Sequence, residues 1–155
     1  MDAFAQFCNR KADIFFSRLD ETGSSGINFF SQRLFPSLGY YCFPPPGVIL
    51  ATIIHLAWFK VSGLLVIPAW PSASFWSNIL PDGKHLPRWA DRCLRFRANF
   101  VVDPEIISST FKSPSTFDSL VIKFDFARVK EDELFLPNFV PDCCFEGGCI
   151  LCLTL

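Results

Sequence analysis

Four cysteines in the last thirteen residues are the densest cluster of metal-binding side chains in this sequence. They are Cys143, Cys144, Cys149 and Cys152, so that an adjacent pair precedes a C-x2-C pair. C-x2-C is a common half-site for zinc, and the two glycines at 147–148 would let the chain fold back around an ion. The adjacent pair fits a single tetrahedral ion less well. The tail therefore predicts either a zinc site or a frayed chain end whose cysteines are incidental.

A second chemical feature is a run of four arginines within ten residues. They are Arg88, Arg92, Arg95 and Arg97, and the residues between them favour one helical stretch. Two interpretations stay open, a solvated helix face or a surface that contacts the phosphates of a nucleic acid.

Hydrolase and nucleotide-binding motifs are absent from the sequence. There is no G-x-S-x-G elbow, no phosphate-binding G-x-x-x-x-G-K and no complete G-x-G-x-x-G. The two histidines are His55 and His85. We expect His55 to be a structural or surface residue, because it lies in the middle of a predicted helix, away from the strand ends where ligands bind.

The elements that would position any site are clearest between residues 39 and 76. Residues 40–43 favour a short aromatic strand, which the prolines at 44–46 end because they donate no backbone hydrogen bond. Residues 48–60 carry apolar side chains at helical spacing, and 64–67 form a continuous apolar run typical of a buried strand. The pattern predicts a βαβ unit, with ligands expected at the loops 43–47 and 68–76 that follow its two strands.

The remaining segments complete an α/β fold, a small and mostly parallel Rossmann-like sheet with flanking helices. We expect a short strand within 27–34, a helix over 72–80 capped by Ser72, and an edge strand over 119–129. Residues 1–129 would form the domain and 130–155 an extended, cysteine-rich and irregular tail. The predicted core residues are Ile53, Leu56, Leu65, Val66, Ile67, Phe75, Val121, Ile122 and Phe124.

Composition narrows the class of protein. Of 155 residues, 50% are hydrophobic and 19 are phenylalanine, which argues against disorder, and a net charge of −1 gives no overall nucleic-acid footprint. No apolar run reaches the roughly 20 residues that span a bilayer, so no membrane partner is expected. Without a secretory signal pattern, the odd count of 7 cysteines favours reduced thiols or metal over disulfides. These features predict an intracellular protein, in the cytoplasm or the nucleus.

Several short motifs together resemble one family. They are DAFAQFCN at 2–9, FFSR at 15–18, GINFFSQ at 26–32, YCFPPP at 41–46, VIPAWPSASFW at 66–76 and PDGKHLP at 81–87. In this set the chain resembles the segment that follows the reverse transcriptase and RNase H domains in DIRS-type tyrosine-recombinase retrotransposons. The resemblance implies a piece of a retroelement polyprotein, with nucleic acid or other polyprotein domains as its partners.

The same segment resembles phage-type DNA adenine methyltransferases. These have an acid near the first strand, a downstream asparagine, an Asn-Pro-Pro-Tyr turn after a strand, and a later tryptophan-containing loop. Asp2, Asn9, the turn 43–46 and Trp76 stand in those places and in that order. The resemblance implies S-adenosylmethionine contacts at Asp2 and Asn9, nucleic-acid contact at Trp76, and a first strand that would precede Met1.

The turn departs from the methyltransferase motif at both functional positions. It reads Phe43, Pro44, Pro45 and Pro46, so the motif's hydrogen-bond acceptor is a phenylalanine and its stacking tyrosine a proline. We therefore expect a catalytically degenerate, methyltransferase-like module with a structural or nucleic-acid-associated role and no bound cofactor. The alternatives are an active S-adenosylmethionine-dependent DNA adenine methyltransferase and a zinc-dependent nucleic-acid-binding module.

Overall fold

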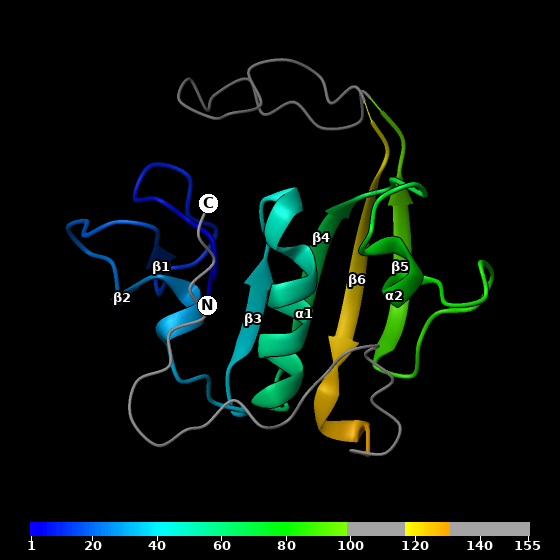
Figure 1. Ribbon diagram of the computed structural model, residues 1–155. Coiled ribbons are helices and arrows are strands. Elements are labelled where there is room, and N and C mark those ends of the chain that lie inside the picture. Colours follow the sequence, from blue (N-terminus) through cyan, green and yellow to red (C-terminus); the bar gives the residue numbers. More distant parts are fainter. Residues whose placement is uncertain (99–116, 131–155) are drawn as a thin grey trace.

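A four-stranded mixed sheet forms the centre of the computed structural model, which describes residues 1–98 and 117–130 (Figure 1). Its strands lie in the order β3 (Gly39–Cys42), β4 (Ser62–Pro68), β6 (Ser119–Asp125) and β5 (Ala90–Phe96). β3 and β4 are parallel, while β6 is antiparallel to both of its neighbours. The protein is therefore of the mixed α/β class.

The predicted βαβ unit is confirmed. After β3, the turn continues into a 3-10 helix, η2 (Pro46–Val48), and then into α1 (Ile49–Trp58), which leads to β4. Pro45 has the extended φ of −54° and ψ of 146°, so the proline run ends the strand before the helix begins. Lys60 ends the unit's helix with a left-handed φ of 51°.

A second, two-stranded sheet joins the first through the start of the chain. It consists of β1 (Phe16–Ser17) and β2 (Gly26–Ile27), which are parallel. Asp2 lies between the two sheets and forms parallel bridges to Phe15 on one side and Tyr41 on the other. The backbone hydrogen bonds include Ala3 N–H to the Tyr41 carbonyl at 2.8 Å and Phe16 N–H to the Asp2 carbonyl at 2.9 Å.

The predicted mostly parallel sheet is found in part: two of the three strand pairs of the four-stranded sheet are antiparallel, whereas the two-stranded sheet and both bridges of Asp2 are parallel. Two other predictions about the sheet are wrong. The strand predicted over 119–129 is not at the edge, since β6 lies between β4 and β5. The arginine-rich stretch is not a helix but strand β5, because pairing with β6 along its length outweighs its helix propensity.

Two smaller elements also differ from prediction. Within 27–34 the strand ends at Ile27, and a 3-10 helix follows, η1 (Phe29–Ser31), because the Asn28 side chain accepts the Phe30 N–H. The helix predicted over 72–80 is a single turn, α2 (Trp76–Ile79), whose N-cap is Phe75 and not Ser72. After β6 comes a 3-10 helix, η3 (Phe126–Arg128).

The hydrophobic core lies between α1 and one face of the sheet, in agreement with most of the predicted core. Alternate residues of the central strands point inward, and Leu65, Ile67, Ile122 and Phe124 are at most 1% exposed. Val66 and Val121 are half-buried, because strand alternation turns them to the opposite face. Leu64 and Leu94, on that opposite face, are 42% and 62% exposed.

Of the predicted domain division, the structure describes the larger part. The core cluster runs from Ala3 to Val129, within the predicted domain 1–129. The tail, with Cys143, Cys144, Cys149 and Cys152, lies outside the described residues apart from Lys130, so its irregular form and its zinc site stay predictions. Among the described helices, none has the length and apolar character needed to cross a membrane.

The close approach of β3 and β4 depends on Gly63, which gives the first testable prediction. A Cβ at this position would fall 2.7 Å from the Tyr40 carbonyl carbon and 2.8 Å from its nitrogen, and closer still to the carbonyl oxygen. Because these are backbone atoms in a paired strand, we expect Gly63→Ala to lower the free energy of unfolding by about 2 to 3 kcal/mol in urea denaturation.

Gly39 on the partner strand is the matched control, since a Cβ there would meet no atom within 4 Å. Gly39→Ala should change the free energy of unfolding by no more than about 1 kcal/mol. Equal effects of the two substitutions would contradict the close packing of β3 on β4.

Candidate functional site

The proline turn lies at the carboxyl end of β3, where ligands are expected in an open α/β sheet. Pro44 is buried, while Pro45 and Pro46 are exposed. The Val48 N–H donates to the Pro45 carbonyl at 3.0 Å, which closes the turn. Since the side chains from Phe43 to Val48 carry no polar atom, the turn offers a ligand only backbone groups and apolar surface.

Asp2 lies beside this turn, because its backbone pairs with Tyr41, two residues before Phe43. The side chain is 3% exposed. Its Oδ2 accepts the Lys11 N–H at 2.9 Å and its Oδ1 accepts the Phe4 N–H at 3.3 Å. Burial, followed by the charge of Asp2, raises the pKa of the Tyr41 phenol above its ordinary value. The carboxylate thus holds the start and the end of the loop that follows it.

Asn9 supports the same loop. Its Oδ1 accepts the Gln6 N–H at 2.7 Å, and its own N–H donates to the Gln6 carbonyl at 3.1 Å. The loop 3–10 contains no glycine, the residue that lets a backbone approach a dinucleotide closely in Rossmann-type sites. Asp2 and Asn9 therefore do not fit the cofactor role that the resemblance implies, because their oxygens already bind backbone amides.

Trp76 is not a free tryptophan in the loop after β4. It is the first residue of α2, is half-buried, and packs against the hydrophobic core. In the same loop the Trp70 ring lies 5.2 Å from the Phe117 ring. Only part of the Trp76 indole surface is therefore available for the predicted contact with a nucleic acid.

The arginines do not form one patch, because β5 sends them to both faces of the sheet. Arg92 lies opposite the exposed Lys123, whereas Arg95 lies opposite the buried Leu120. Arg95 Nη2 is 2.7 Å from an oxygen of Asp118. The Ala98 N–H and then Arg95 lower the pKa of the Asp118 carboxyl, so one arginine of the four is neutralised.

Arg97 is exposed, and Arg88 is exposed at the start of the segment that leads into β5. Across the strand, Lys123 Nζ pairs with Asp91 Oδ2 at 2.7 Å, which offsets a further positive charge. The phosphate-binding interpretation therefore loses the continuous basic face on which it was based.

The described thiols are those of Cys8, Cys42 and Cys93, and none of them is in a disulfide. Burial raises the pKa of the Cys42 thiol, so it remains protonated and unreactive. Within residues 1–98 and 117–130, no three metal-ligating side chains come together.

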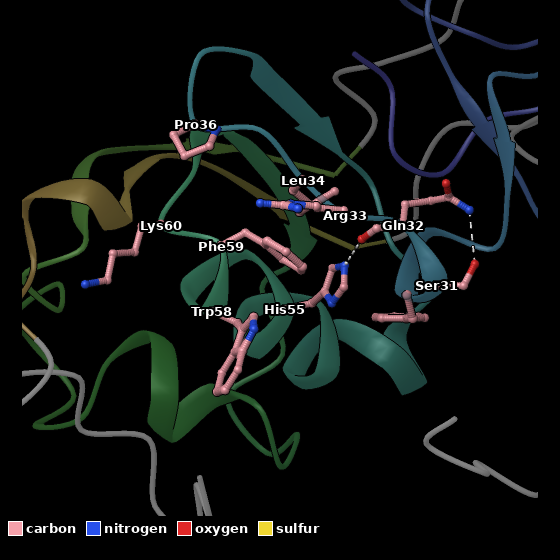
Figure 2. A pocket seen from close by; sticks show the side chains of 10 residues that line it. Ser31, Gln32, Arg33, Leu34, Pro36, His55, Trp58, Phe59 and Lys60 are labelled. Atoms are coloured by element: carbon pink, nitrogen blue, oxygen red, sulfur yellow. Dashed lines mark hydrogen bonds between the residues drawn. The ribbon is translucent and has the colours of Figure 1, made fainter. Parts of the chain in front are cut away.

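A hollow of about 560 Å³ between η1 and the end of α1 was missed by sequence reasoning (Figure 2). His55 joins its two sides, with Nε2 lying 3.1 Å from the Gln32 carbonyl oxygen. Its ring packs edge-on against Phe29, Phe30 and Phe59 with centroids 4.9 to 5.8 Å apart. The structural role predicted for His55 is confirmed. In the sequence, only the adjacent pairs Phe29-Phe30 and Trp58-Phe59 pointed to this hollow.

Comparison with known proteins adds no assignment: no family model and no curated protein matches this chain.

The hydrogen bonds of Asp2 give a second prediction. Removing the carboxylate in Asp2→Ala leaves the Phe4 and Lys11 amides without their acceptor in a partly buried place. We expect the free energy of unfolding to fall by about 2 to 3 kcal/mol, measured by urea denaturation. The exposed Asp13 is the control, and Asp13→Ala should change it by less than about 0.5 kcal/mol. A loss no larger than that of the control would contradict the structural role of Asp2.

The burial of His55 gives a third prediction. Burial lowers the pKa of His55 below its ordinary value of 6.5, so the unfolded chain binds a proton there before the folded chain does. The free energy of unfolding should therefore fall as pH decreases from 7.5 through 6.5, by less than about 1.4 kcal/mol per pH unit from this group.

His55→Gln, which keeps a donor for the Gln32 carbonyl, should lose this part of the pH dependence. Urea denaturation at pH 7.5 and 5.5 measures it, with His85→Gln at an exposed histidine as the control. The prediction fails if His55→Gln and the wild-type chain lose equal stability between the two pH values.

Proposed function

We propose that this chain is a catalytically degenerate, methyltransferase-like module from a retrotransposon polyprotein, with a structural or nucleic-acid-associated role. The observation that carries the proposal is the state of Asp2. Its two carboxylate oxygens already accept backbone amides, beside a proline turn whose side chains offer no hydrogen-bond acceptor.

The arrangement of strands supports a Rossmann-like origin. Across both sheets the order is β2, β1, residues 1–3, β3, β4, β6 and β5. Numbered along the chain, this is 3-2-1-4-5-7-6, which is the doubly wound order 3-2-1-4-5-6 with one antiparallel strand inserted before the last. The order reverses between residues 1–3 and β3, and ligands of such sheets bind at this switch point. Asp2 and the proline turn stand on its two sides.

The chemistry expected of an amino-group methyltransferase explains why we propose a degenerate module. In the resembled motif, a polar side chain and the first proline's carbonyl accept the hydrogens of the exocyclic amine, and an aromatic ring stacks on the base. Phe43 accepts no hydrogen bond through its side chain, and Pro46 has no aromatic ring. Without this acceptor and this ring, the turn would not position the amine, and catalysis of this kind depends on positioning.

The other two functions have weaker support. An active methyltransferase would have to release Asp2 from the Phe4 and Lys11 amides before it could hold a cofactor. A zinc-dependent module would depend on the tail cysteines, outside the described residues, and on arginines that β5 divides between two faces.

Calorimetric titration of S-adenosylmethionine into the purified, reduced chain is the decisive experiment and the fourth prediction. We expect no saturable heat up to about 1 mM ligand. Any dissociation constant would then be far larger than the value of about 1 μM that an ordinary ligand site would give. Far-ultraviolet circular dichroism and a cooperative thermal transition establish that the sample is folded.

Saturable binding that Asp2→Asn weakens would overturn the proposal in favour of an active enzyme. A methylation assay on single- and double-stranded DNA would then follow. Stoichiometric zinc in the purified chain, together with loss of nucleic-acid binding after chelation, would favour the zinc-dependent module instead.

A further inference from the structure

Strand β5 is the outer edge of the four-stranded sheet, beyond β6 (Figure 1). Its backbone pairs with β6 on one side, and within residues 1–98 and 117–130 no strand pairs with its other side. Such an edge presents a row of N–H and C=O groups that have no partner in the sheet. Another extended chain can bind these groups by adding a strand, which is a common way of recognising peptides.

The part of β5 that can accept a strand runs from Arg92 to Phe96. The pairing with β6 is irregular only between Ala90 and Arg92, and it is regular from there to the end of the strand. Leu94, in the middle of this run, is 62% exposed. An added strand would cover the Leu94 side chain, because facing residues of paired strands lie about 5 Å apart. The edge therefore offers an apolar centre in addition to its backbone.

The two acids beside β5 each have a cationic partner. Lys123 Nζ donates to Asp91 Oδ2 at 2.7 Å, and Arg95 Nη2 lies 2.7 Å from Asp118 Oδ2. Each of these carboxylates is therefore balanced by one cation, and the charge that is left at the edge is positive.

Arg92 and Arg97 supply this remaining charge. Both are exposed, they stand at the two ends of the run 93–96, and neither forms an ion pair with a described residue. A second copy of this chain would bring the same positive charge to the edge, and like charges on paired strands oppose association. A strand with acids at both of its ends would gain two ion pairs in either direction of pairing. The edge therefore selects an acidic partner over a second copy.

We propose that the outer edge of β5 binds an extended acidic segment of another polypeptide, which adds to the sheet as a further strand. Acidic side chains at the two ends of this segment pair with Arg92 and Arg97, and β-branched side chains at its centre cover Leu94. The inference goes beyond the proposed function and is independent of the methyltransferase-like origin, because it uses neither Asp2 nor the proline turn.

The test is fluorescence anisotropy with the full chain and three labelled peptides. The first has a valine-threonine centre and a pair of glutamates at each end. The second has lysines in place of the glutamates, and the third keeps the glutamates but has prolines in its centre. We expect saturable binding of the first peptide alone, because proline donates no backbone hydrogen bond and cannot complete the ladder. Binding should weaken at high salt, since exposed charges are screened.

The variant Arg92→Glu tests the location. It replaces an ion pair by two like charges, so it should weaken binding of the glutamate peptide roughly 2- to 30-fold. The same variant should bind the lysine peptide more tightly than the wild-type chain does, a gain that an unfolded variant would not show. Arg18→Glu, at an exposed arginine outside β5, is the matched control and should bind both peptides as the wild-type chain does.

Equal binding of the glutamate peptide and the proline-centred peptide would mean attraction by charge without strand addition. Equal losses in Arg92→Glu and Arg18→Glu would mean that the edge of β5 is not the site. Either result overturns the proposal, and so does a folded chain that binds none of the peptides.

Two other occupants of the edge have their own signatures. A dimer in analytical ultracentrifugation, without peptide binding, would make a second copy the occupant. Binding of labelled oligothymidylate that Arg92→Glu weakens, again without peptide binding, would make a nucleic acid the occupant. Both results overturn the proposal, and neither changes the calorimetric result with S-adenosylmethionine.

Discussion

The backbone of Asp2 is the connection on which the rest of the fold depends. It pairs with Phe15 on one side and Tyr41 on the other, so that seven short segments form one continuous layer. Two strands of two residues each, such as β1 and β2, are not stable alone in water. They are held because residues 1–3 attach them to β3, and because the Asp2 carboxylate fixes the loop between.

This structural use of Asp2 limits what the switch point can do. A cofactor site at the end of a strand needs free polar groups and a backbone that a ligand can approach. Here the Asp2 carboxylate already accepts hydrogen bonds from two backbone amides of its own loop. Ala3 and Ala5 are buried at positions where a glycine-rich loop would leave space for a ligand. The arrangement that keeps the N-terminal strands in place is therefore the same one that engages both oxygens of the Asp2 carboxylate.

Local patterns predicted the βαβ unit well, because prolines and continuous apolar runs act within a few residues. Long-range pairing could not be predicted in the same way. The spacing of Arg88, Arg92 and Arg95 suits one face of a helix, and only the pairing of β5 with β6 turns it into a strand. The central place of β6 likewise depends on β5 joining outside it. Two-residue strands such as β1 carry no periodic signal at all. The hollow between η1 and the end of α1 could not be predicted, because its two sides are distant in sequence and meet through His55 and Gln32.

The proline turn and the hollow lie at opposite ends of α1. The helix has ten residues, so the proline turn before it and Trp58 at its end are about 15 Å apart along its axis. Substitutions this far apart, with no shared partners, generally act independently on stability and binding. Substitutions in the turn residues Phe43 and Pro46 can therefore be tested separately from substitutions in the hollow at the other end of α1.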